Sequence, residues 1–205
     1  MEFTEQEKKR VAEAVFQAEL STSGEIVPLV VKSSDHYTYA DLVCGIMGEI
    51  VFLAASYWIF PAFERFAVSG MLVAGFVAGF ALCRLVPALK RFVAGQHVAR
   101  HEVMQRAQQA FFEHNLMRTR DRTGILIMVS LLERRVQVIA DEGIHAQVPD
   151  GTWDAVVQTV LSEIAAGSVI DGLVAGIAQC GKILSEKFPR KSDDTNEIGD
   201  DLIVE

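Results

Sequence analysis

The sequence predicts an α/β fold, a small mixed sheet covered by helices, that is interrupted by a two-helix transmembrane hairpin. Two apolar runs, Ala40–Phe60 and Ala67–Val86, are separated only by Pro61–Phe66, which predicts the hairpin. On both sides of the hairpin, short runs of branched apolar residues alternate with longer amphipathic stretches, which predicts strands covered by helices. We therefore expect a single small domain with an insertion.

Residues 1–38 are expected to form the first part of the domain, a helix followed by a strand. Thr4 and Glu7 have the spacing of a capping box at the start of the helix. The run EIVPLVV at Glu25–Val31 is predicted to be a buried strand, in which Pro28 favours an edge or a bulge. No apolar segment follows the charged opening MEFTEQEKKR, so a cleavable signal peptide is not expected.

Residues 39–90 are predicted to form the hairpin, since each apolar run reaches the roughly 20 residues that a helix needs to cross the hydrocarbon core. Glu49 is a carboxylate within the first span, where its insertion costs roughly 2.5–3.5 kcal/mol, so we expect it to pair with Arg84 of the neighbouring helix. The alternatives are a protonated Glu49 and separate snorkelling of the two side chains. Small residues are expected where the helices pack: Gly45, Gly48, Gly75 and Gly79.

Basic residues that flank the hairpin predict its orientation. The loop between the spans offers Arg65, offset by Glu64, whereas the flank after the second span is rich in Lys and Arg. Because the cytoplasmic flank collects these residues, we expect both termini and the domain to be cytoplasmic. The expected partners are the lipid bilayer and a further copy of the chain through the hairpin.

Residues 91–190 are expected to supply the remainder of the domain. A helix over Gln96–Leu116 precedes the apolar run ILIMVSLL and the alternating run RVQVIA at Arg135–Ala140, which together predict a hairpin of two antiparallel strands. Two helices follow, one over Trp153–Ala165 and one that begins at a Ser168 cap. The strand EIVPLVV therefore has to pair with strands that lie beyond the membrane segment.

The charge distribution argues against binding of nucleic acid, since the net charge is −8 and no basic stripe with interleaved aromatic residues is present. The tail 191–205 is acidic and has little to bury, so we expect it to be disordered. Cys44, Cys83 and Cys180 have no metal-binding spacing, and their number and placement are typical of a reducing compartment.

Acidic residues at the ends of predicted strands are the candidates for chemistry. Asp141 and Glu142 follow the run RVQVIA, and Asp121 lies beside Arg120 before the preceding strand. Oxygen ligands of this kind can hold Ca²⁺ or Mg²⁺, and arginines can bind a phosphate, so these four residues are the catalytic candidates. The weak metal candidates are Asp141, Glu142 and Asp150. The alternative, which we favour, is a solvated turn and a basic loop beside lipid headgroups, because no DxD, P-loop or paired-carboxylate motif is present.

The sequence also resembles a known family. TSGEIVPLVV after an amphipathic helix, then RTRDRTGILIMVSLLERRVQVIADEGI, then a Trp-containing helix and a Gly-rich one, are similar to the TPM domain. The tail that follows Phe188 resembles that of the family's bacterial predicted membrane proteins, which implies the bacterial inner membrane. The resemblance implies an α/β sandwich. It implies no single activity, since members are linked to acid phosphatase activity, to assembly and photosystem II repair, and to modulation of a receptor.

From these observations we expect a non-enzymatic, membrane-anchored TPM-like domain that binds, assembles or modulates another membrane protein or complex. The alternative is a membrane-anchored, metal-assisted acid phosphatase-like hydrolase that uses the acidic candidates and the nearby arginines. Transport is disfavoured, because two spans cannot enclose a path without oligomerising.

Overall fold

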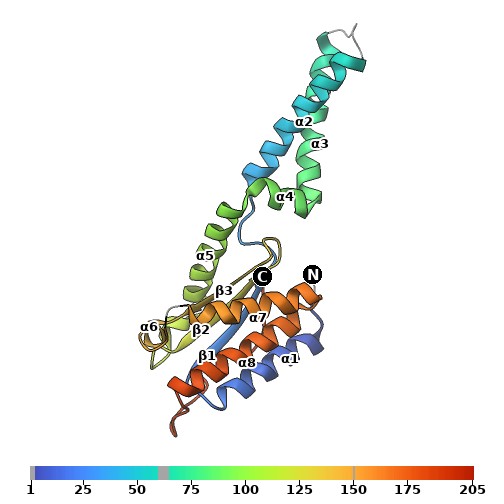
Figure 1. Cartoon of the computed structure of the whole chain (residues 1–205). Helices are drawn as coiled ribbons and strands as arrows, with labels where there is room; N and C mark the ends of the chain where they lie inside the picture. Colours follow the sequence, from blue (N-terminus) through green and yellow to red (C-terminus); the bar gives the residue numbers. More distant parts are fainter. Residues whose placement is uncertain (1–2, 60–64, 150) are drawn as a thin grey trace. The chain divides into compact units, whose positions relative to one another are not determined.

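The computed structural model describes residues 3–59, 65–149 and 151–205, which group into two compact units (Figure 1). The α/β unit comprises Met1–Ser34 and Glu102–Glu205, and the hairpin unit comprises Asp35–His101. The α/β unit is thus built from two stretches of chain that are separated in the sequence by the whole hairpin unit.

The α/β unit contains a four-stranded mixed sheet in the order β3-β2-β1-β4 (Figure 1). β1 (Glu25–Val31) and β2 (Gly124–Ser130) pair in parallel, although they come from opposite sides of the hairpin unit in the sequence. β3 (Arg135–Ala140) pairs with β2 in the antiparallel sense, and the short β4 (Ile203–Val204) pairs with β1 in parallel. The predicted mixed α/β fold is therefore confirmed.

Helices cover both faces of this sheet, which explains why every residue of β1 and β2 is buried. One face packs against α1 (Glu5–Glu19), α7 (Thr152–Ala166) and α8 (Val169–Lys187), and the other packs against α5 (Gln96–Glu113) (Figure 1). Alternate residues of β2 serve the two faces. Ile125 and Ile127 belong to the core under the three helices, whereas Leu126 and Met128 belong to the core under α5.

Local sequence signals fix the ends of the helices. The capping box of α1 is formed, with the Thr4 N–H donating to Glu7 at 2.8 Å and the Glu7 N–H donating to the Thr4 hydroxyl at 3.3 Å. Gly167, at φ 114°, ends α7, and Ser168 then caps α8. Two short elements complete the unit, a 3-10 helix η1 (Leu116–Arg118) and α6 (Glu142–His145).

Pro28 occupies an inner strand, β1, and not the edge or bulge that the sequence predicts. The physical reason is that β4 covers only part of β1. Alternate residues of β1 present their backbone groups to the edge of the strand that faces β4. On this edge the Glu205 N–H donates to the Val30 carbonyl at 2.9 Å, and the Ile26 N–H donates to the Glu19 carboxylate at 2.8 Å. Pro28 lies between these two positions, on a stretch that β4 does not pair with, so its missing N–H leaves no gap in the β4 ladder.

The acidic tail 191–205 is ordered, whereas the sequence predicts disorder. Leu202 is buried, and the Glu25 carboxylate accepts the N–H groups of Glu197 and Ile198 at 3.2 and 3.3 Å. The tail's acids also meet cations of the same unit: Asp193 pairs with Arg120, Asp194 with Arg190, and Glu205 with Arg106. The composition of the tail predicts disorder because its acidic residues repel one another. The cationic partners that hold the tail lie outside the acidic segment or are not evident from composition.

The hairpin unit contains two helices that are long and apolar enough to cross a membrane, α2 (Thr38–Ile59) and α3 (Arg65–Leu85). Their apolar stretches have mean hydropathies of 1.5 and 1.8, and only 22% and 11% of these stretches are buried within the protein. A core helix of a soluble protein would be mostly buried. The pair is followed by α4 (Pro87–Ala94), a short amphipathic helix.

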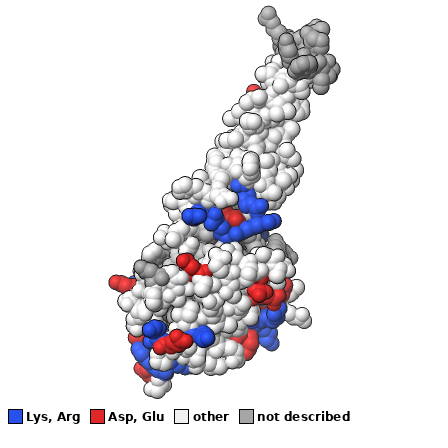
Figure 2. Space-filling view, in the orientation of Figure 1, with Lys and Arg blue, Asp and Glu red and all other residues white. Residues whose placement is uncertain are grey.

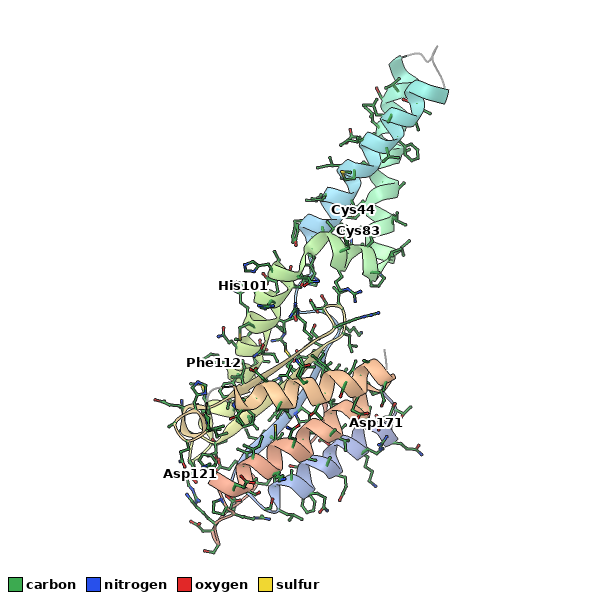
Figure 3. The ribbon with its side chains drawn as sticks, viewed as in Figure 1. Cys44, Cys83, His101, Phe112, Asp121 and Asp171 are labelled. Carbon is green, nitrogen blue, oxygen red and sulfur yellow. The ribbon has the colours of Figure 1, made fainter. Side chains whose placement is uncertain are left out.

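Glycines lie where α2 and α3 pack together. A Cβ at Gly48 would be 2.3 Å from the Gly75 carbonyl oxygen, and one at Gly79 would be 2.1 Å from the Cys44 carbonyl oxygen. Gly45 instead faces the ring of Phe76. The two helices therefore approach backbone to backbone, which requires small residues at these positions. Cys44 and Cys83 lie close to this contact (Figure 3).

The predicted pair of Glu49 and Arg84 is absent from the described ion pairs, and the register of the helices explains why. The Arg84 side chain is exposed and lies over the Phe80 ring, 5.9 Å from its centroid. The adjacent Cys83 thiol donates to the Ala40 carbonyl at 3.5 Å, so Arg84 is level with the start of α2. Glu49 lies nearly ten residues further along α2, or about 14 Å at a helical rise of about 1.5 Å.

A different ion pair joins the elements of the hairpin unit, and sequence reasoning missed it. Lys90 Nζ of α4 lies 3.1 Å from Asp41 Oδ2 of α2, and their side chains are only 14% and 5% exposed. Nearby, the Tyr39 hydroxyl donates to the Ala94 carbonyl at 2.7 Å. These two contacts fix α4 to the first turns of α2.

Candidate functional site

The loop before β2 and the turn after β3 meet at one edge of the sheet, because β2 and β3 are antiparallel neighbours. The Asp141 N–H donates to the Gly124 carbonyl at 2.9 Å, and the Gly143 N–H donates to the Arg122 carbonyl at 3.1 Å. A Cβ at Gly143 would lie 2.6 Å from the carbonyl oxygens of Asp121 and Arg122, so the two loops touch through their backbones. The predicted catalytic candidates therefore come from loops that lie side by side.

Asp141 has a structural role, because its carboxylate caps a helix and pairs with an arginine. It is 5% exposed, its Oδ1 accepts the Glu142 N–H at 2.7 Å to cap α6, and its Oδ2 lies 3.0 Å from Arg122 Nε. The neighbouring Glu142 side chain is 88% exposed and lies 3.9 Å from Arg122. Asp141 therefore stabilises the fold, whereas the Glu142 side chain is directed to solvent.

Asp121 and Arg120 belong to a surface network of opposite charges. Lys191 Nζ lies 2.7 Å from Asp121 Oδ2, and this hydrogen bond, together with the charges of Lys191 and Arg120, holds the pKa of Asp121 below its usual value. Arg120 in turn pairs with Asp193 of the tail at 3.1 Å. A carboxyl group with a lowered pKa stays ionised, so Asp121 is unsuited to act as a general acid near neutral pH.

An open pocket of about 470 Å³ adjoins this network. Its cationic side chains come from the end of α8 and the residues that follow, and polar groups of the neighbouring loops complete it. The polar and charged lining residues are Ser23, Asp121, Thr123, Gln147, Lys187, Arg190 and Lys191. Such a set of cations and hydroxyl groups can bind an anion such as phosphate.

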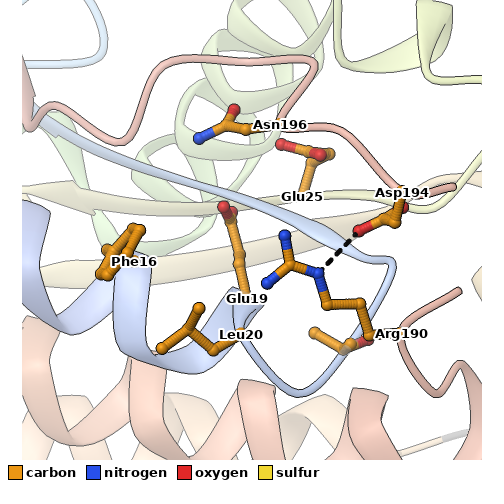
Figure 4. A pocket seen from close by; sticks show the side chains of 8 residues that line it. Phe16, Glu19, Leu20, Glu25, Arg190, Asp194 and Asn196 are labelled. Carbon is orange, nitrogen blue, oxygen red and sulfur yellow. Dashed lines mark ion pairs between the residues drawn. The ribbon is translucent and has the colours of Figure 1, made fainter. Parts of the chain in front are cut away.

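A second, smaller pocket of about 40 Å³ lies between the end of α1 and the tail (Figure 4). Arg190 Nε lies 3.6 Å from Asp194 Oδ2 on one wall, and the carboxylates of Glu19 and Glu25 form another. Burial raises the pKa of Glu19 to about 8, against the opposing hydrogen bond from the Ile26 N–H. Burial also raises the pKa of Glu25, against the hydrogen bonds from two tail N–H groups.

Two large apolar side chains stand at this smaller pocket (Figure 4). Phe16 lies on the last turn of α1 and Leu20 is the C-cap residue of this helix. They are 47% and 44% exposed, and both line the pocket. The sequence indicated neither these residues nor the buried glutamates as a site. The available signal was Glu25 at the head of an otherwise apolar strand, but its partners in the tail were assigned to a disordered segment.

The predicted metal ligands do not fit a Ca²⁺ or Mg²⁺ site in the described part of the chain. Asp141 is engaged by Arg122, Glu142 is directed to solvent, and Asp150 lies outside the described residues. Across residues 3–59, 65–149 and 151–205, no three His, Cys, Asp or Glu side chains are placed to hold a metal ion together. A hard divalent cation needs several oxygen ligands, which these residues do not offer it.

The raised pKa of Glu19 predicts that stability depends on pH. The folded value, about 8, lies above the ordinary value of 4.5, so the folded state binds more protons than the unfolded state between these limits. The stabilisation is fully present below pH 4.5 and is lost as the pH rises through 8, by at most about 1.4 kcal/mol per pH unit. Glu19→Gln still accepts from Ile26 but cannot ionise. It should therefore flatten the profile and be more stable than the wild type at pH 8.

Denaturant unfolding between pH 5 and pH 9 measures this effect. Glu13→Gln, the same replacement at an exposed position of α1, is the control and should leave the profile unchanged. Parallel pH profiles for the wild type and Glu19→Gln would contradict the prediction.

The comparisons with known proteins agree with this architecture. Residues 91–183 match the family model of the TPM domain, so the predicted resemblance to the TPM domain family is confirmed over these residues, which run from the end of the hairpin unit into α8. No curated protein matches the chain.

One solved structure with a similar fold is the NMR structure of the BA42 protein from the psychrophilic bacterium Bizionia argentinensis. The TM-score is 0.63 and the sequence identity 21%, over 100% of this chain and 97% of that one. At this identity the likeness concerns the fold alone.

Proposed function

We propose that this chain is a membrane-anchored TPM-like domain that binds another membrane protein or complex through its α/β unit. The observation that carries the proposal is the exposed pair Phe16 and Leu20 beside a pocket whose walls carry charges of both signs. An apolar anchor surrounded by polar groups is the usual anatomy of a protein-binding surface. In this proposal the hairpin lies in the bacterial inner membrane and the α/β unit lies in the cytoplasm.

The state of the acidic residues supports binding over hydrolysis. Asp141 caps a helix, and Asp121 is neutralised by Lys191 and Arg120. Residues engaged in this way stabilise a surface but do not supply a general acid or base. The basic flank of the second span, which predicts a cytoplasmic α/β unit, supports the proposed orientation.

Site-directed photocrosslinking in cells tests the binding role. A photoreactive amino acid at Leu20 should give an adduct with a discrete membrane protein, because this position is 44% exposed beside the pocket. The matched control is Phe112, which is 59% exposed on α5 and remote in sequence from the pocket residues. The same adducts from both positions, or none from Leu20, would overturn the proposal.

The pocket of about 470 Å³ supports a second candidate, the phosphatase-like hydrolase, because its lysines and arginine can bind a phosphate beside Asp121. We expect the purified full chain to hydrolyse no generic phosphomonoester, with Mg²⁺ or Ca²⁺ added. Asp121→Asn is a better variant for this test than a change at Asp141, whose loss would disturb the fold. Metal-dependent turnover that disappears in Asp121→Asn would establish the hydrolase.

A further inference from the structure

The short helix α4 presents two opposite faces within the hairpin unit. Lys90 and Ala94, one turn apart, are the positions that contact Asp41 and Tyr39 of α2. Phe92 lies two residues from each of them, and therefore on the opposite side of the helix. Its side chain is 83% exposed, which is a large apolar surface to leave in water.

The position of α4 along the chain places it where the spans end. It contacts residues of the first turns of α2, and it begins two residues after the end of α3 at Leu85. Leu85 is itself 80% exposed. Since both spans have their ends here, a helix fixed at this level lies at the boundary between the hydrocarbon and the water.

Positive charge predominates near α4. Figure 2 shows Lys and Arg side chains gathered at the base of a hairpin that is otherwise almost uncharged. Lys90 is neutralised by Asp41, but Arg84, Arg91 and Arg100 add positive charge at the end of α3, on α4 and at the start of α5. An anionic leaflet complements this excess of positive charge, at about 1 kcal/mol for each basic residue near the surface.

We propose that α4 is an interfacial helix that binds anionic lipid. Phe92 and Leu85 enter the boundary between headgroups and acyl chains, and the three arginines contact lipid phosphates. The Asp41–Lys90 pair holds α4 in the orientation that allows both contacts. This inference rests on the proposed insertion of the hairpin in a membrane.

Fluorescence quenching in vesicles of phosphatidylcholine and phosphatidylglycerol tests the depth of α4. The full chain, with Trp58 and Trp153 changed to Phe, carries a single tryptophan through Phe92→Trp. Lipids brominated near the headgroup should quench it severalfold more strongly than lipids brominated near the bilayer centre. Val73→Trp, at a 65% exposed position of α3, should show the reverse, and Phe112→Trp should be quenched by neither.

The three tryptophan positions distinguish the interfacial role of α4 from the insertion of the hairpin in the membrane. If Val73→Trp is not quenched, the membrane anchor itself is wrong. If Val73→Trp is quenched but Phe92→Trp is not, the hairpin inserts and the interfacial role of α4 is wrong. Shielding of Phe92→Trp from aqueous iodide without lipid quenching would show that a protein surface, such as a second copy, covers α4 and would also overturn the inference.

The lipid preference is measured by the ratio of phosphatidylglycerol to phosphatidylcholine that remains with the protein after gentle extraction from mixed vesicles. The wild type should be enriched severalfold in phosphatidylglycerol over the bulk ratio. Changing Arg84, Arg91 and Arg100 to Gln should abolish the enrichment. The control changes three basic residues of the α/β unit, Arg118, Arg134 and Lys182, to Gln and should keep it. Equal enrichment in both triple variants would contradict the anionic-lipid site.

Discussion

Replacing Gly79 by leucine is expected to break the packing of α2 against α3, whereas the same replacement at Gly70 should be tolerated. A Cβ at Gly79 would lie 2.1 Å from the Cys44 carbonyl oxygen, so the two backbones themselves must separate. At Gly70 nothing lies within 4 Å of the added atom. Overpacking costs about 1–3 kcal/mol and occasionally more, and we expect at least the upper end because backbone cannot move aside as a side chain can.

The amount of full chain in the membrane and its thermal midpoint in detergent measure this difference. Both should fall for Gly79→Leu and stay near the wild-type values for Gly70→Leu. Because both glycines belong to α3, helix propensity and hydrophobicity change equally in the two variants. Equal behaviour of the pair would show that α2 and α3 do not approach as described.

Removing the Asp41 carboxylate is expected to be the most damaging change at the base of the hairpin. Asp41→Ala leaves the Lys90 ammonium, only 14% exposed, without its partner. Loss of one member of a buried ion pair costs about 3–5 kcal/mol, whereas replacement of both members by apolar residues of similar volume is often neutral. The double variant Asp41→Leu with Lys90→Met should therefore regain most of the stability lost in Asp41→Ala.

Thermal unfolding of the full chain in detergent distinguishes the three forms. The wild type should have the highest thermal midpoint, the double variant a midpoint close to it, and Asp41→Ala a midpoint well below both. If the double variant is as unstable as Asp41→Ala, the carboxylate acts through a partner other than Lys90.

The secondary structure of the α/β unit follows from local patterns in the sequence. Glu25–Val31 and Gly124–Ser130 are uninterrupted apolar runs because both faces of each strand are covered. Thr4 and Ser168 mark helix starts through hydrogen bonds that involve only neighbouring residues. Such signals need no knowledge of the tertiary fold, which is why the fold class was predictable.

Features that depend on contacts distant in sequence were not predictable in the same way. The tail became ordered through partners such as Arg106 and Glu25, which lie far from it in the sequence. The pair of Glu49 with Arg84 does not form, because the register that the glycine contacts impose places the two residues at different levels of the hairpin. Asp41 and Lys90 are 49 residues apart, and no local motif connects them.

The candidate site was also predictable only where it depends on local patterns in the sequence. The closeness of Asp121 to the Asp141 turn followed from the antiparallel pairing of two adjacent strands, which the sequence predicts. The ion pair between Asp141 and Arg122 was not predictable from the sequence, because burial and ion pairing depend on the tertiary structure. For the same reason the pocket beside Phe16, which is closed by the tail, could not be seen in the pattern of residues.

One α/β unit is assembled from chain on both sides of the hairpin of two apolar helices. Replacing residues 36–95 by a flexible linker tests this assembly most directly, since β1 is the strand that pairs with both β2 and β4. The linked protein should be soluble without detergent and unfold cooperatively, and residues 96–205 alone should not fold. Cooperative unfolding of 96–205 alone, at the stability of the linked protein, would contradict the claim.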